Sequence, residues 1–254
     1  MEYELSWLMV LLLVGTGIIA GFVNILAAGG SFLTIPTLML FGIPADIANA
    51  TNRVGVFLQA AEGIRGFRQR GMLEWHSFVA MMVPTLIGSL AGALLASYLD
   101  VAILEPVILT TLIAMAVLMV VKPSSFNPPQ GSTPLSPWSS PSGFFGLLLS
   151  GIYGGFIQAG VGFVLIAALC GSLRYDLVRA NALKMAATGV FTLVSLTVFI
   201  LRGQILWIPG LLLALGSVVG AWLAVKFAVT VSQQVLRWFL LCVVVTVCIT
   251  VWLQ

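Results

Sequence analysis

The stretch NILAAGGSFLTIPTLMLFGIP, residues 24–44, decides how the rest of the chain is interpreted. It is strongly apolar, yet it contains an asparagine, two adjacent glycines, two prolines and several hydroxyl side chains. The clean apolar run at 31–41 is only about half of the roughly 20 residues that a helix needs to cross a bilayer. At membrane depth, irregular backbone is tolerated only where it is buried in protein or lines a polar cavity. The stretch therefore predicts a broken or re-entrant helix near 31–41.

The composition predicts an integral membrane protein. Of 254 residues, 60% are hydrophobic and only 7% are charged, whereas soluble domains carry about 25% charged residues. The apolar runs are continuous rather than alternating, which argues against an outer-membrane barrel. The three cysteines lie in apolar runs without CxxC spacing, so they are interpreted as core residues, and no metal or cofactor is expected. The expected partners are the bilayer and a small ligand, with no nucleic acid; a homo-oligomer stays open.

Apolar segments follow one another along the chain, and three of them are shorter than a span. The short ones are 31–41, 143–157 and 161–171. The Pro- and Ser-rich residues 122–142 are predicted to form a cytoplasmic linker between a first membrane region, 1–121, and a second, 143–254. The segments are 5–24, 31–41, 47–66, 76–98, 102–121, 143–157, 161–171, 176–200, 205–227 and 230–253.

The two halves resemble each other in sequence. Four short motifs recur in the same order and at a nearly constant offset, which is hard to obtain by chance and predicts an internal duplication. The pairs are GSLAGALLA (88–96) with GSVVGAWLA (216–224), RGMLEW (70–75) with RGQILW (202–207), ANA (48–50) with ANA (180–182), and AAGGSFL (27–33) with QAGVGFV (158–164). The two GSxxGAxxA motifs are interpreted as faces for close helix packing.

The distribution of basic residues predicts that the second repeat is inverted in the membrane. If the arginine-rich loop near residues 65–70 is cytoplasmic, an inverted second half leaves only Arg202 outside, in agreement with the positive-inside rule. The expected fold is thus an all-α polytopic membrane protein of two inverted-topology repeats. Each repeat has about five helical segments and a short broken or re-entrant helix near 31–41 or 161–171. Both termini are predicted to be non-cytoplasmic.

Inverted repeats with broken helices in matching positions indicate a secondary transporter whose site lies near the midplane. A helix that starts after each glycine-rich break would offer free N–H groups and a partial positive charge, so two facing starts would form an anion cradle. Polar residues gather beside both breaks. The candidate substrate-binding residues are Asn24, Gly29, Gly30, Ser31, Asn49, Thr51, Asn52, Arg53, Gln158, Gly160, Gly162, Asn181 and Lys184.

Two cations inside apolar segments are the leading candidates in that set, because ionisable residues in a membrane are costly. Lys184 lies about two turns into its helix, too deep to reach the interface easily, and is predicted to bind the anion. Arg53 is also a candidate, with the alternative that it extends outward to the interface. Asn49 and Asn181 could be ligands or could tie down the broken backbone, and the same choice applies to Asn24 and Gln158.

The motifs GGSFLTIPTLMLFGIPADIANATN (29–52), GIYGGFIQAGVGFVLIAAL (151–169) and ANALK (180–184) resemble those of the TauE/SafE sulfite exporter family. The resemblance covers nearly the whole chain apart from the linker. It implies a permease of the bacterial inner membrane for small anions such as sulfite or organosulfonates. The sequence departs from the family pattern at Ala28 and Gln158, where a continuing glycine-rich stretch is expected.

Two other functions are weighed against a transporter. An anion channel would use the same cradle. An intramembrane enzyme would need a nucleophile and a base; Ser31 and Lys184 are the one pair that could meet as such a dyad, while the single histidine and the lack of clustered cysteines argue against catalysis. The chain is expected to be a transporter and not an enzyme.

Overall fold

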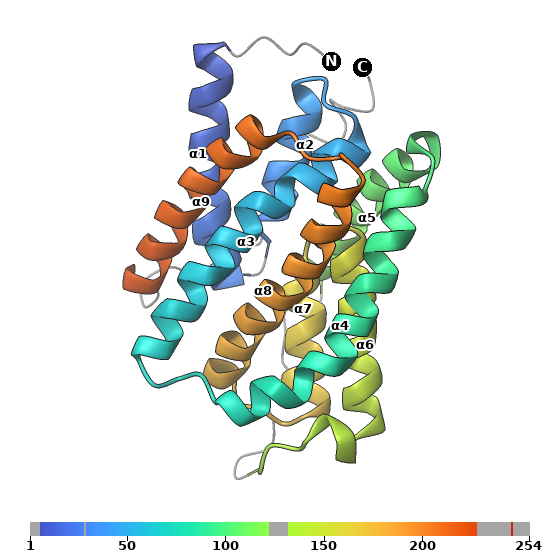
Figure 1. The fold of residues 1–254 in the computed structure, drawn as a ribbon. Coiled ribbons are helices and arrows are strands. Elements are labelled where there is room, and N and C mark those ends of the chain that lie inside the picture. The colour runs from blue at the N-terminus through green and yellow to red at the C-terminus, as the bar shows by residue number, and fades with distance from the viewer. Residues whose placement is uncertain (1–5, 28, 122–131, 228–244, 246–254) are drawn as a thin grey trace.

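A computed structural model describes residues 6–27, 29–121, 132–227 and 245 of the chain (Figure 1). These residues form helices joined by short turns, and no strand occurs among them. The helices are α1 (Trp7–Ala27), α2 (Ser31–Leu40), α3 (Ala45–Gln69), α4 (Trp75–Tyr98), α5 (Val101–Val121), α6 (Pro141–Phe156), α7 (Val161–Ile166), α8 (Leu177–Leu201) and α9 (Trp207–Phe227). A 3₁₀ turn at Pro137–Ser139 precedes α6, and a π-helical turn at Ala167–Ser172 continues α7.

Five of the described helices, α1, α4, α5, α8 and α9, are long and apolar enough to cross a membrane. α3 is as long as α8, at 25 residues, but has a much more polar composition. It packs against both α8 and α9, and polar residues along it, among them Asn49, Asn52 and Arg53, are buried in the core. The predicted all-α polytopic membrane protein is confirmed. The expected segment 230–253, apart from residue 245, and residues 122–131 of the linker lie outside the described residues.

The short helices form where the sequence predicts them. α2 has 10 residues, and α7 with its π-helical continuation ends at Ser172. α6 begins at Pro141, two residues earlier than predicted, so the end of the proposed linker belongs to the helix. Proline at the first helical position lacks an N–H that would otherwise be unpaired, and the Ser140 hydroxyl accepts from the Gly143 N–H at 3.3 Å. These caps explain the earlier start.

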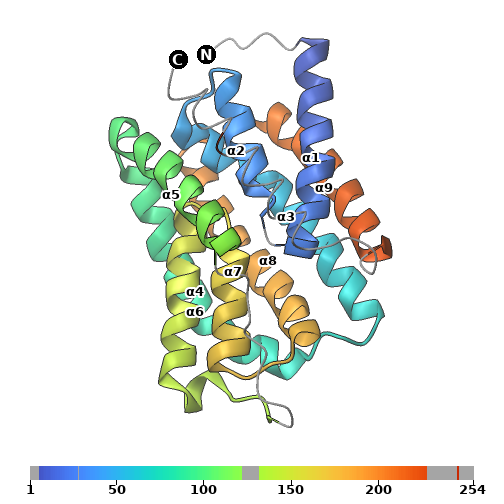
Figure 2. The same ribbon diagram turned by 180° about the vertical axis from the view of Figure 1, so that it is seen from behind.

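Helices from the two halves of the sequence pack against each other. α1 lies along α9, α4 lies along α6, and α3 and α8 lie between these pairs (Figures 1 and 2). In the view of Figure 1, α1 and α3 run from the upper end to the lower end, whereas α6 and α8 run upward. Helices at equivalent places in the two halves therefore run in opposite directions.

Glycines bring these helix pairs into backbone contact. A Cβ added at Gly220 of α9 would lie 1.9 Å from the Ile18 carbonyl oxygen of α1, and one at Gly92 of α4 would lie 2.0 Å from the Ile152 carbonyl oxygen of α6. Only a residue without a side chain fits at such distances. The interpretation of the two GSxxGAxxA motifs as packing faces is confirmed, and it holds at the same motif position in both.

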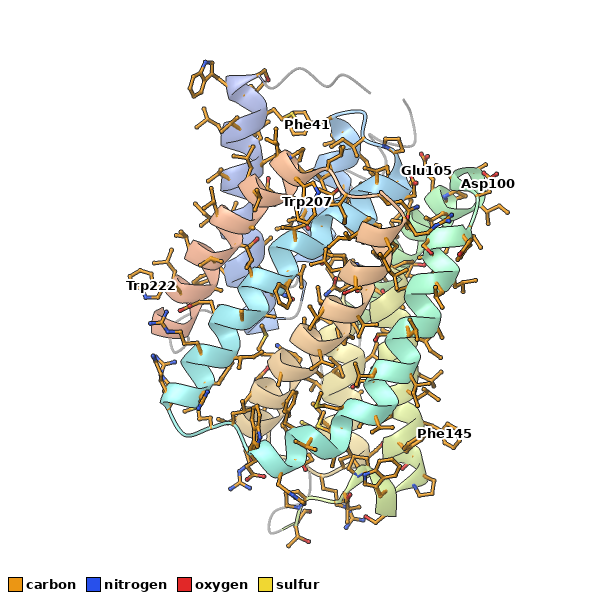
Figure 3. The ribbon with its side chains drawn as sticks, in the orientation of Figure 1. Phe41, Asp100, Glu105, Phe145, Trp207 and Trp222 are labelled. Carbon is orange, nitrogen blue, oxygen red and sulfur yellow. The ribbon has the colours of Figure 1, made fainter. Side chains whose placement is uncertain are left out.

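The two ends of the helix bundle differ in charge. At the lower end, Arg179 bridges α8 to Glu74 at 2.9 Å, and exposed arginines lie in the last turns of α3 and directly after it. At the upper end, Asp100 caps α5 by accepting from the Ala102 N–H at 2.9 Å, and Figure 3 shows Asp100 and Glu105 together there. Among the described residues, most of the basic side chains outside the core lie at the lower end.

Candidate functional site

A buried cavity lies where the two helix breaks meet. It is small and narrow, with space for about one water molecule. It is lined by residues of α1, α2, α3, α7 and α8 and of the turn before α7, that is, from both halves of the sequence. The lining residues are Asn24, Ser31, Val56, Gln158, Val161, Gly162, Lys184, Met185 and Thr188.

The two breaks use glycine for different reasons. Gly160, before α7, has φ +74°, and a Cβ there would lie 2.6 Å from Cζ of Phe32 in α2. Gly30, before α2, has an ordinary helical φ of −58°, but a Cβ there would lie 2.5 Å from the Ala20 carbonyl oxygen. The first glycine is needed for its backbone conformation and for space, and the second for space alone. The starts of α2 and α7 are thereby brought close together, as the cradle hypothesis requires.

Lys184 is the cation that lines the cavity. Its side chain is 2% exposed. Its ammonium group donates to the Asn181 amide oxygen at 3.0 Å, one turn earlier on α8, and to the carbonyl oxygens of Asn24 and Ile25 at 3.4 Å each. Those carbonyls belong to the last turn of α1, the partially negative end of that helix. These two bonds are long and therefore weak. They hold the ammonium group beside the cavity but use little of its hydrogen-bonding capacity.

The start of α2 is tied to α3 by a buried chain of hydrogen bonds. The Asn52 side-chain amide donates to the Ser31 hydroxyl at 3.0 Å, and the Thr34 hydroxyl donates to the Asn52 oxygen at 2.5 Å. Ser31 thus accepts from Asn52 and keeps its own O–H for another partner. Asn52 positions Ser31 and does not line the cavity itself.

Gln158 contributes an incompletely bonded amide to the cavity wall. Its side-chain nitrogen donates to the Thr192 hydroxyl oxygen at 2.6 Å, while its side-chain oxygen is buried without a hydrogen-bond partner. The residue has φ +70°, which is rare for a side chain other than glycine. A strained, buried amide with an unpaired atom is typical of a ligand-binding position.

Arg53 lies elsewhere in the core, and the alternative that it extends outward to the interface is wrong. Its side chain is fully buried. The guanidinium donates to three carbonyls at the end of α6, those of Gly154, Gly155 (3.0 Å) and Phe156 (3.1 Å). Asn49 donates to the same Phe156 carbonyl at 2.8 Å. Outward extension is unfavourable because α3 is enclosed by other helices and the α6 carbonyls would lose their donors.

The thirteen candidate residues therefore fall into separate groups. Asn24, Ser31, Gln158, Gly162 and Lys184 line the cavity. The others shape its surroundings: Gly29, Gly30 and Gly160 form the breaks, Asn52 and Asn181 bond to lining residues, Asn49 and Arg53 hold the end of α6, and Thr51 accepts from the Leu206 N–H before α9 at 3.0 Å.

Four lining residues are absent from the sequence-based set: Val56, Val161, Met185 and Thr188. Thr188 follows Lys184 by one helical turn, so helical spacing alone could have identified it. Val56, Val161 and Met185 carry no polar signal, and their place in the wall depends on the packing of α3, α7 and α8.

The cavity wall carries one cation and several neutral polar groups. None of its lining residues is acidic, and the described residues contain no cluster of His, Cys, Asp or Glu that could hold a metal ion. Ser31 and Lys184 both reach the cavity, but no hydrogen bond joins these two described residues. Hydroxyl and amide groups, a helix start and one ammonium group are the donors that an anion needs.

Comparison with known proteins identifies the family of this chain. The model of the sulfite exporter TauE/SafE family matches residues 13–251. The chain belongs to this family. A probable membrane transporter protein of Haemophilus influenzae is 29% identical over 224 residues, which cover 87% of this chain and 86% of the relative. The probable membrane transporter protein YfcA of Escherichia coli K12 is 25% identical over 226 residues, covering 86% and 80%, and the probable membrane transporter protein ORF9 of a Sinorhizobium species is 25% identical over 219 residues, covering 86% and 83%.

These relatives place the chain among membrane transporters. The names of the relatives state no substrate, and the family description names sulfite. The departure at Gln158 lies in the cavity wall, whereas Ala28 lies outside the described residues.

Proposed function

We propose that this TauE/SafE family member carries a small anion, sulfite or an organosulfonate, across the bacterial inner membrane. The observation that carries the proposal is the cavity in which Lys184, the start of α2 at Ser31 and the start of α7 at Gly162 come together. A buried ammonium group with hydroxyl and amide donors around it is a site for a negatively charged oxygen. The relatives' printed names support transport, and the family description supports a sulfur oxyanion.

The proposal includes two inverted repeats, 1–121 and 143–254, with the site between them. It is supported by the opposite directions of α3 and α8 and by the matching packing of α1 on α9 and of α6 on α4. The orientation in the membrane follows from charge: the lower end holds Arg65, Arg68, Arg70, Arg174 and Arg179. Under the positive-inside rule this end is cytoplasmic, so α1 begins on the non-cytoplasmic side, and with the predicted segment 230–253 as a further span both termini are non-cytoplasmic.

Alternating access is favoured over a channel because the cavity is enclosed. Ser31, Gln158 and Lys184 are at most 4% exposed, and the space holds about one water molecule. A sulfonate is larger than that, so it enters only when the lining side chains and helices move. The flexible side chain of Met185 is one lining group that can rearrange. A channel, in contrast, needs a continuous polar path.

The test is flux into proteoliposomes with sulfite, several sulfonates, thiosulfate and sulfate. Saturable flux of at least one anion is expected. Lys184→Ala is expected to abolish it and Lys184→Arg to keep part of it. Arg65→Ala is the matched control because Arg65 is 71% exposed and distant from the cavity wall. Normal flux in Lys184→Ala would exclude the site, flux that does not saturate would favour a channel, and conversion of a substrate to product would favour an enzyme.

A further inference from the structure

The charged groups around the cavity limit the charge that a bound substrate can have. We propose that the site selects monovalent anions and rejects divalent ones of the same size and shape. This inference rests on the proposed transport function and deepens it, because it names the property by which the site distinguishes sulfonates from sulfate-like dianions.

Lys184 supplies the one charged side chain among the residues that line the cavity. Its ammonium group is not neutralised by a carboxylate: its bonded partners are the Asn181 amide oxygen and the Asn24 and Ile25 carbonyls. One full positive charge is therefore available to a ligand.

The helix ends beside the cavity add only a fraction of a charge. The last turn of α1, whose carbonyls contact Lys184, carries a partial negative charge of about one half, and the starts of α2 at Ser31 and of α7 at Gly162 each carry a partial positive charge of at most about the same size. Their sum is at most about half of one positive charge, so together with Lys184 the cavity offers less than the two positive charges that a divalent anion needs.

The second buried cation does not add to the site. Arg53 is absent from the cavity wall, and its terminal nitrogens donate to the carbonyls of Gly154, Gly155 and Phe156 at the partially negative end of α6. These bonds hold its guanidinium at the end of α6, outside the cavity wall.

The remaining polar groups of the wall are neutral. They are the side chains of Asn24, Ser31, Gln158 and Thr188. The buried Gln158 amide has one unpaired atom, and because the Thr192 hydroxyl can either donate or accept, the amide can rotate and offer its N–H₂ to an anion. Such groups bind oxygens of either a sulfonate or a sulfate, so they do not discriminate between them.

Discrimination therefore comes from net charge. A monovalent anion beside Lys184 gives a neutral pair in the membrane interior. A divalent anion leaves one negative charge buried without a partner, which is strongly unfavourable. The inference concerns the charge of the ligand and holds for any small oxyanion.

The experiment uses methanesulfonate and sulfate, which share a tetrahedral sulfur and nearly the same volume but differ by one charge. Flux of both is measured with the intact wild-type protein in proteoliposomes at the same pH, so that no variant has to fold. Methanesulfonate is expected to be carried more efficiently than sulfate by on the order of 100-fold. Comparable flux of the two would overturn charge selection while leaving anion transport standing, and flux of no anion at all would overturn the proposed function and this inference with it.

A variant assigns the selection to Lys184. Lys184→Gln retains a hydrogen-bonding side chain and removes the charge. It is expected to lose methanesulfonate flux to the level of protein-free liposomes. Full methanesulfonate flux with unchanged discrimination in Lys184→Gln would overturn the assignment.

Discussion

Arg53 of α3 and Lys184 of α8 each donate hydrogen bonds to the final carbonyls of a helix from the other half of the sequence. Arg53 binds the end of α6, and Lys184 binds the end of α1. α1 and α6 both end at a helix break, where carbonyls at membrane depth have no water to donate to them. The two cations thus satisfy equivalent helix ends, but only Lys184 also borders the cavity.

Arg53→Ala is expected to destabilise the protein by several kcal/mol, since each buried acceptor left without a donor costs about 1–3 kcal/mol. The reason is that three α6 carbonyls lose a donor inside the membrane. Arg53→Lys is expected to recover part of this loss, since an ammonium group cannot reproduce the planar fork of a guanidinium.

Thermal unfolding of the purified variants in detergent checks this expectation. Arg202→Ala serves as the control, because Arg202 is exposed and contacts the Tyr98 ring at 4.2 Å at the upper end. If Arg53→Ala unfolds at the wild-type temperature, the assignment of Arg53 to the end of α6 is incorrect.

The sequence identified both cations but not their different environments. The position of a residue along its helix can be read from the sequence, and it correctly indicated that Lys184 is buried. For Arg53, which lies about as far into α3 as Lys184 lies into α8, the sequence left two alternatives open, a site residue and extension to the interface. What buries Arg53 is the placement of α6 against it, a contact between residues about one hundred positions apart in the chain. No local pattern contains that information.

The breaks and the packing faces were more predictable. Short apolar runs with glycine identified α2, and α7 together with its π-helical continuation, to within a residue or two, and paired small residues identified the contacts of α4 and α9. The apolar part of the cavity wall was not predictable, because Val56 and Met185 differ from other core residues only through their neighbours.

Gly21→Ala is expected to destabilise the protein, whereas Gly15→Ala on the same helix is not. A Cβ at Gly21 would lie 2.1 Å from the Ser217 carbonyl oxygen, which forces α1 away from α9, while a Cβ at Gly15 meets nothing within 4 Å. Overpacking of this kind costs about 1–3 kcal/mol. Unfolding temperatures of the two variants provide the measurement, and equal values for both would contradict the observed packing of α1 on α9.

Gly160→Ala is expected to abolish transport, and Gly203→Ala is the matched control. Both glycines have positive φ, +74° and +67°, so alanine at either costs about 1–2 kcal/mol of backbone strain. Only at Gly160 does the added Cβ also meet a side chain, Phe32 at 2.6 Å. Displacement of Phe32 would move the start of α2 and Ser31 with it.

Flux and unfolding are measured together for these two variants. The expected result is a loss of stability in both, larger in Gly160→Ala because of the added contact with Phe32, with loss of flux in Gly160→Ala alone. Retained flux in Gly160→Ala would mean that the contact between the two breaks is dispensable for transport.

Gln158→Glu is expected to reduce anion flux by about tenfold or more, which corresponds to about 1.4 kcal/mol of lost binding free energy. The substitution hardly changes the size of the side chain and keeps a hydrogen bond to Thr192, whose hydroxyl can donate to a carboxylate. It places a negative charge in the same cavity wall as Lys184, where it competes with the substrate for the ammonium group. Gln69→Glu, an exposed change of the same kind at the lower end of α3, is the control for the added charge. The concentration dependence of flux checks the expectation: the concentration for half-maximal flux should rise in Gln158→Glu, and an unchanged value would remove Gln158 from the substrate site.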